Sequence, residues 1–233
     1  MRPVNRGDRP LNNGGMAKTF ANYESARKDL IDRMGQYCSY CNQKLPASLA
    51  VEHVRPKSLH PALELEWSNF LLGCTNCNST KGVKPINLND YLWPDIHNTH
   101  LAFEYTTDGK VGVKAGLSGP LTIKAQNMLD LVGLQTYPNT ATSSDRRWLN
   151  RKAAFAMANT CLMLYNSASA KGAADESAIL LAYLASENGF FSIWMHVFDA
   201  FPSVKEKIVE AFKGTAADSL NVDYSFRKRT VEL

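Results

Sequence analysis

Long hydrophobic runs are absent from this 233-residue sequence. No stretch of about 18 apolar residues occurs, so we expect no transmembrane helix and no membrane partner. The first seven residues also lack the apolar stretch of a secretory signal, and we therefore expect a cytoplasmic protein. Internal repeats and low-complexity segments are missing as well. With 45% hydrophobic and 21% charged residues, the composition is typical of a soluble globular protein with one large or two small domains.

A strong excess of one charge is also absent. The formal net charge is +4, which by itself does not indicate nucleic-acid binding. Residues 1–44 carry 8 Lys/Arg and 4 Asp/Glu, residues 45–118 carry 6 and 7, and residues 119–233 carry 12 and 11. Because the middle segment is nearly neutral, we expect this chain alone to bind nucleic acid weakly.

Cysteine is scarce, yet four of the five cysteines form two Cys-x-x-Cys pairs, Cys38 with Cys41 and Cys74 with Cys77. In a reducing compartment such pairs are typical metal ligands and not disulfides. Four thiolates satisfy the tetrahedral coordination of a structural Zn²⁺, so we predict zinc here. Iron accepts the same ligands, and a redox pair or unrelated cysteines are the remaining alternatives. Cys161 stands alone in an apolar helical stretch, where we expect a buried side chain.

The two cysteine pairs are separated by 32 residues, which exceeds the roughly 15–20 residues of a simple zinc ribbon. We therefore expect a folded element between them. Its first part is a short apolar strand that ends in Glu52-His53. A loop and a second apolar strand, introduced by Asn69, follow. A helix then begins at the second cysteine pair and carries Asn78 and Lys81.

These residue types suit hydrolysis of a phosphodiester, which needs a base for water, a cation on the phosphate oxygens and a stabilised leaving group. His53 is the candidate base, because its ordinary pKa of about 6.5 permits proton abstraction at neutral pH. Glu52 and Asn78 offer oxygen ligands to a catalytic Mg²⁺ or Mn²⁺. Asn69 is expected to brace the loop and orient His53. The candidate contacts to substrate phosphate are Lys81, Arg55 and Lys57.

Together the motifs resemble the zinc-knuckle branch of the HNH endonucleases. The similar parts are both cysteine pairs, Glu-His-Val-x-Pro from residue 52, Asn69, and Cys-Asn-x-x-Lys-Gly from residue 77. By this resemblance His53 is the first H, Asn69 the middle N, and Asn78 the third, metal-binding position. The resemblance implies an α+β fold with a ββα-metal core at residues 38–84. In this core a four-cysteine zinc site stabilises the fold, and a separate site binds one catalytic divalent ion.

A wider resemblance extends to the PtuB family, the HNH subunits of Septu-type and retron-linked anti-phage systems. It is carried by residues 1–7, residues 26–31, and Asn98-Thr99 with the segment that follows. It implies a PtuA-like ATPase partner that controls the nuclease, and a role in bacterial defence. DNA is the expected substrate. An RNA-cleaving enzyme acting on tRNA, or a zinc-held binding module without activity, remains an alternative, because a metal site that engages phosphate carries no base code.

Hydrophobic spacing predicts the elements around this core. Residues 22–34 are expected to be helical with Gly35 as the stop, and residues 101–114 to form a hairpin that turns at Asp108-Gly109. Three apolar helical faces follow: Leu121, Ala125, Met128, Leu129 and Val132; Trp148, Phe155, Ala156, Leu162 and Met163; Ile179, Leu180, Tyr183 and Leu184. A last helix is predicted from the capping box Ser203–Glu206 to Gly214.

The domain organisation expected from this pattern has two parts. Residues 1–118 contain the N-terminal segment and the HNH domain. Residues 119–233 form a mainly α-helical region, which is the expected docking region for a partner. The histidines that lack neighbouring candidate ligands are expected to be structural or surface residues: His60, His97, His100 and His196.

Overall fold

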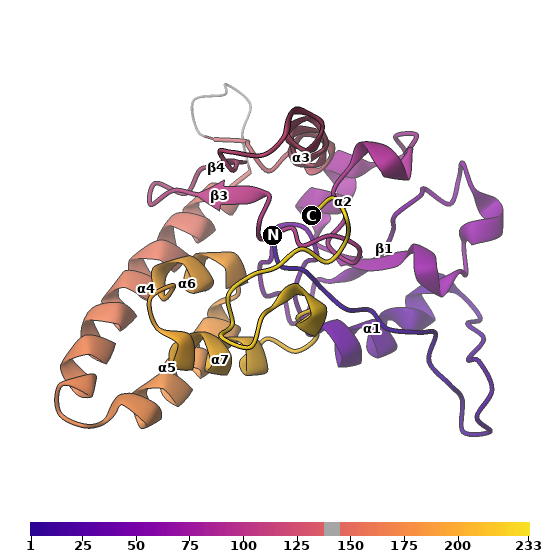
Figure 1. Ribbon diagram of the computed structural model, residues 1–233. Coiled ribbons are helices and arrows are strands. Elements are labelled where there is room, and N and C mark those ends of the chain that lie inside the picture. Colours follow the sequence, from indigo (N-terminus) through magenta and orange to yellow (C-terminus); the bar gives the residue numbers. More distant parts are fainter. Residues whose placement is uncertain (138–144) are drawn as a thin grey trace.

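Seven helices and four strands carry the fold in the computed structural model, which describes residues 1–137 and 145–233 (Figure 1). The helices are α1 (Arg27–Met34), α2 (Thr75–Lys81), α3 (Gly119–Val132), α4 (Arg147–Ser169), α5 (Ala174–Asn188), α6 (Phe191–Val197) and α7 (Pro202–Ala211). The strands form two antiparallel pairs, β1 (Ala50–His53) with β2 (Phe70–Gly73) and β3 (Phe103–Tyr105) with β4 (Val111–Val113). The predicted α+β class with a helical C-terminal part is confirmed. Within the described ranges, no helix combines the length and the apolar character that crossing a membrane requires.

The central unit is the predicted strand–loop–strand–helix element. In the β1–β2 pair, Glu52 lies opposite Leu71 and His53 opposite Phe70. All four residues of β2 are buried, as expected for a short apolar run in the interior. The β2 strand leads through Cys74 into α2, and the thiol of Cys74 caps this helix by accepting a hydrogen bond from the backbone N–H of Cys77. This connection places the second cysteine pair at the start of α2.

The N-terminal helix is confirmed with a modified first turn. Residues Tyr23–Ala26 form a 3₁₀ turn, in which the side chain of Asn22 accepts a hydrogen bond from the backbone N–H of Ser25. The α1 helix continues to Met34 and ends at Gly35, whose φ of 73° suits glycine. The hairpin at residues 101–114 is also present, with strands of three residues each. Local spacing therefore predicted both elements.

The buried side chains form two main hydrophobic cores. One contains α1, the β1–β2 unit and α3, including the predicted face with Ala125 and Met128. The other is built by α4–α7, which lie together on one side of the molecule (Figure 1). The α3 helix thus packs with the N-terminal core, although the sequence placed it with the helical region. The domain boundary at residue 118 stays a prediction.

Buried polar side chains join segments that are far apart in the sequence. The guanidinium of Arg2 donates to the carbonyl oxygens of Met34 (2.6 Å) and Phe212 (3.0 Å). The amide of Asn98 donates to the carbonyl oxygen of Ser219 (3.0 Å). Arg2 and Asn98 both lie in segments that carry the wider resemblance. Their contacts explain these residue types structurally, because each side chain donates hydrogen bonds that connect distant segments in the interior.

The expected apolar face of α5 was wrong. The large side chains assigned to it are 39–61% exposed: Ile179, Leu180, Tyr183 and Leu184. The residues that are buried instead are mostly alanines: Ala178, Leu181, Ala182 and Ala185. Small side chains let α5 pack closely against α4 and α7, so close packing favoured the alanine face. On α4, Phe155 is buried as predicted, whereas Ala156 and Met163 are exposed.

The predicted capping box of the last helix was also wrong. The α7 helix begins at Pro202, one residue before Ser203, and no side chain caps it. Proline is well suited to the first helical position, because its missing N–H would have no intrahelical acceptor there. The helix ends at Ala211, earlier than the predicted stop at Gly214. The short α6 helix was not predicted from the sequence.

Candidate functional site

The four paired cysteines converge in one buried cluster. The Sγ atoms of Cys38, Cys41, Cys74 and Cys77 all lie within 4.8 Å of one another. Those of Cys41 and Cys74 are 3.8 Å apart, and no disulfide links any of the four. Zn–S bonds of about 2.3 Å place two sulfur ligands of a tetrahedral zinc ion about 3.8 Å apart. The donor set and its spacing therefore fit a structural zinc ion.

One buried arginine contacts this cluster from the start of α4. Nη1 of Arg147 lies 3.0 Å from Sγ of Cys77 and donates to the carbonyl oxygen of Val132 (3.0 Å), while Nη2 donates to that of Gly133 (2.7 Å). Four thiolates around Zn²⁺ leave a net negative charge, which a nearby guanidinium stabilises. Sequence reasoning missed this role, because Arg147 lies in a short basic cluster of the kind that usually faces solvent.

His53 stands at the end of β1 with its ring fixed on several sides. Nε2 lies 3.0 Å from the backbone carbonyl oxygen of Glu64, so the tautomer that donates this hydrogen bond leaves Nδ1 as the free acceptor. The rings of Tyr23 and Phe70 meet the imidazole edge-on, with centroids 4.9 and 5.3 Å away. Burial lowers the pKa of His53 below its usual value. The lowered pKa favours the neutral ring, which is the form that a general base requires.

Glu52, next to His53, is paired with a lysine inside the protein. Nζ of Lys81 lies 2.8 Å from Oε1 of Glu52 and donates to the carbonyl oxygen of His53 (2.7 Å). Burial raises the pKa of the Glu52 carboxyl group, and the ammonium of Lys81 opposes this effect. The sequence assigned Lys81 to substrate phosphate, but the structure binds its ammonium within the site. The reason is that α2 packs against β1 and directs Lys81 at the strand.

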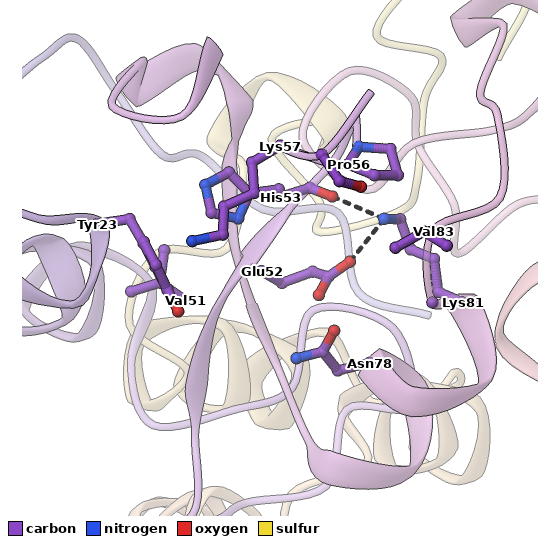
Figure 2. Close-up of a pocket in the computed structure, with 11 residues that line it drawn as sticks. Tyr23, Val51, Glu52, His53, Pro56, Lys57, Asn78, Lys81 and Val83 are labelled. Carbon is purple, nitrogen blue, oxygen red and sulfur yellow. Dashed lines mark hydrogen bonds and ion pairs between the residues drawn. The ribbon is translucent and has the colours of Figure 1, made fainter. Parts of the chain in front are cut away.

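Glu52, His53 and Asn78 line one pocket of about 260 Å³. Figure 2 shows the carboxylate of Glu52 between the ammonium of Lys81 and the amide of Asn78. Oε1 of Glu52 has no hydrogen-bond donor among the described residues, since its contact with Lys81 is an ion pair outside hydrogen-bond geometry. These residues also offer no hydrogen bond to the side chain of Asn78. The carboxylate of Glu52 and the amide oxygen of Asn78 both line this pocket, and oxygen ligands of this kind fit a hard divalent cation.

A glycine makes room for this arrangement. A Cβ atom added at Gly73 would lie 3.2 Å from Cβ of Glu52 and 3.6 Å from Cβ of Asn78. The first distance is tighter than ordinary van der Waals contact. The absence of a side chain at the end of β2 therefore lets the strand that carries Glu52 and the helix that carries Asn78 approach each other.

The comparison with protein families agrees with this geometry. The model of the HNH endonuclease family matches residues 38–84. This segment is an HNH domain. A Septu protein PtuB from Bacillus thuringiensis is 30% identical over 115 residues, which cover 47% of this chain and 42% of that protein. Both resemblances expected from the sequence are thus confirmed, while the match spans less than half of the relative's length.

Within the HNH domain, Asn69 holds the loop that follows His53. Its Oδ1 accepts from the backbone N–H of Arg55 (2.8 Å), and its Nδ2 donates to the carbonyl oxygens of Arg55 (3.0 Å) and Leu63 (3.2 Å). The side chain does not line the pocket with His53. The geometry thus gives Asn69 a positioning contact, in the bracing arrangement that we expected from the sequence.

The two other candidate phosphate contacts lie in different places. Lys57 lines the pocket of the HNH domain, with Nζ 2.9 Å from Oε1 of Glu64 and 4.1 Å from the ring centroid of Tyr23. Arg55 instead lines a separate pocket, together with Asn69. The chain bends and turns after β1 at residues 54–57, so the two cations do not share one surface. Lys57 alone of the three candidates has a half-exposed charge at this pocket.

Two residues that contact His53 were missed in the sequence. Tyr23 contributes a ring beside His53, and Glu64 provides the carbonyl oxygen that fixes His53. Neither has a sequence signal, because Tyr23 lies in a different segment and the contact of Glu64 with His53 uses its backbone. The remaining histidines lie outside the pocket, as expected. His100, for example, is stacked on the ring of Phe226, with centroids 3.6 Å apart.

Proposed function

We propose that this chain is a metal-dependent endonuclease that hydrolyses phosphodiester bonds in nucleic acid. The observation that carries the proposal is the convergence of Glu52, His53 and Asn78 in one pocket of the HNH domain. A histidine alone beside a glutamate is commonly structural. Here burial lowers the pKa of the histidine, a backbone carbonyl holds its ring, and two side chains with oxygen ligands line the same pocket.

In the proposed reaction, Nδ1 of His53 takes a proton from water as the water oxygen attacks phosphorus. The bond between phosphorus and the leaving oxygen breaks, and this oxygen takes a proton from solvent. Glu52 and Asn78 would hold the divalent ion, which neutralises charge on the phosphate oxygens and on the leaving oxygen when bound. Lys57 would contact a substrate phosphate at the pocket mouth, and Asn69 would keep the loop after His53 in place.

We further propose DNA as the substrate, a cytoplasmic location and a role in anti-phage defence with a PtuA-like ATPase subunit. The similarity to a Septu protein PtuB and the wider resemblance in residues 1–7 and 26–31 support this role. The nearly neutral charge of residues 45–118 supports a subunit that depends on a partner for substrate binding. We propose the exposed apolar side chains of α4 and α5 as the docking surface for that ATPase.

The test is a cleavage assay with the zinc-loaded chain, alone and with the ATPase. Supercoiled plasmid, single-stranded DNA and tRNA are incubated with Mg²⁺ or Mn²⁺ and, separately, with EDTA. We expect metal-dependent cutting of DNA that His53→Ala and Glu52→Gln abolish. His60→Ala is the matched control, because it removes a nearby histidine that lies outside the pocket.

Each outcome separates the candidate functions. Cutting that needs the ATPase supports the two-subunit system, and cutting of tRNA alone supports the RNA-cleaving enzyme. Equal activity of His53→Ala and the wild-type chain would refute His53 as the base. If no mixture cuts any substrate, the zinc-held binding module becomes the better account.

A further inference from the structure

Lys81 has an unusual position for a lysine in a phosphate-binding site. Its side chain is 2% exposed and that of Glu52 is 3% exposed. Lysine is rarely buried to this degree unless it is paired. Since Lys81 follows Asn78 by three residues on α2, both side chains lie on the helix face that is directed at β1 (Figure 2). Lys81 therefore lines the same pocket as Glu52 and Asn78.

The two contacts of the ammonium have different consequences. The hydrogen bond to the carbonyl oxygen of His53 (2.7 Å) fixes the end of β1, where the candidate base is attached. The ion pair with Oε1 of Glu52 (2.8 Å) supplies the positive charge that a buried carboxylate requires. A divalent ion that binds Glu52 and Asn78 meets this positive charge at short range. In a poorly solvated site such repulsion is strong.

We propose that Lys81 is a positioning residue that lowers the divalent-ion affinity of the substrate-free site. This inference rests on the proposed function, in which Glu52 and Asn78 hold the ion. Lys81 stabilises the carboxylate while no ion is bound, and it competes with the ion for Oε1 of Glu52. The same lysine thus keeps the site assembled and makes its metal binding weak.

Lys57 provides a matched control for the charge of Lys81. It lines the same pocket and carries the same charge, but it is paired with Glu64 and has no contact with Glu52. Its side chain is 42% exposed, so solvent and salt screen its charge. Removal of the Lys57 charge should therefore have little effect on metal binding. It changes the net charge of the chain by the same amount as removal of the Lys81 charge.

The test measures Mn²⁺ binding to the zinc-loaded full chain at pH 8 by electron paramagnetic resonance, without nucleic acid. We expect Lys81→Met to bind Mn²⁺ about tenfold more tightly than the wild-type chain, because one repulsive charge is removed. Lys81→Arg, which keeps the charge, should bind close to the wild-type value. Lys57→Met should stay within about twofold. Asn78→Ala, in the wild-type and Lys81→Met backgrounds, shows whether the measured ion occupies this site.

Several results would overturn the inference while the proposed function stands. One is Mn²⁺ binding that depends on Asn78 but is no tighter in Lys81→Met. Another is an equal gain in Lys57→Met, which would indicate a general charge effect. If Lys81→Met does not fold, Lys81→Gln gives the same comparison, since it removes the charge and keeps an N–H donor. If Asn78→Ala leaves the Mn²⁺ affinity unchanged, the proposed ion site itself is refuted.

Discussion

Substitution of Asn69 tests how the HNH domain holds its candidate base. Asn69 is 5% exposed and forms three side-chain hydrogen bonds to the backbone of Arg55 and Leu63. A net hydrogen bond contributes about 1 kcal/mol, and removal leaves one N–H and two carbonyl groups, all partly buried, without this partner. Asn69→Ala should therefore lower the free energy of unfolding by about 3 kcal/mol.

The assay is urea unfolding of the zinc-loaded chain, followed by circular dichroism and tryptophan fluorescence. Ser68→Ala is the matched control, because Ser68 lies in the same 3₁₀ turn with an exposed side chain. We expect this control to stay within about 0.5 kcal/mol of the wild-type value. Cleavage by Asn69→Ala should fall by more than its unfolded fraction explains, since the loop after His53 loses its support. A loss below about 0.5 kcal/mol, or full activity, would refute the bracing role of Asn69.

Four further predictions concern zinc, the glycine, the cations and the docking surface. Cys41→Ser should lose zinc and unfold at lower urea concentration; zinc retained at one equivalent would contradict the four-cysteine site. Gly73→Ala should keep zinc but weaken Mn²⁺ binding severalfold, and unchanged binding would contradict the close approach of strand and helix. Lys57→Ala should weaken substrate binding about threefold or more, whereas Arg55→Ala should not. Leu180→Asp should leave the melting temperature nearly unchanged but prevent association with the ATPase in sedimentation; a stable complex would refute that surface.

The HNH core could be predicted because its information is local. Cysteine spacing specified the cluster, and the short apolar runs before Glu52-His53 and after Asn69 specified the two strands. Because the four cysteines converge, the 32 residues between the two pairs can adopt few arrangements. The fold class and the family followed from these features. The convergence of Glu52, His53 and Asn78 in one pocket also agrees with the expected arrangement, although their roles remain proposals.

Contacts between segments could not be predicted in the same way. A lysine near a nuclease motif favours the interpretation of an exposed substrate contact, and only the packing of α2 against β1 showed that Lys81 reaches Glu52. Tyr23 lies near His53 because the 3₁₀ turn before α1 packs beside β1. Arg147 contacts the cysteine cluster from α4, 70 residues after Cys77. Each of these contacts depends on tertiary structure that no spacing rule describes.

The α5 helix shows that hydrophobic periodicity identifies apolar faces without saying which face a chain buries internally. Its alanine-rich face packs in the core of the helical region, while Leu180 and Leu184 line an apolar groove of about 270 Å³ beside α4. No charged residue occurs between Lys152 and Lys171 on the α4 side of this groove. Large apolar side chains that a chain leaves exposed in one contiguous area are a common mark of a protein interface. The exposed leucines of α5 thus support the proposal that a partner docks there, because they have no role in the chain's own core.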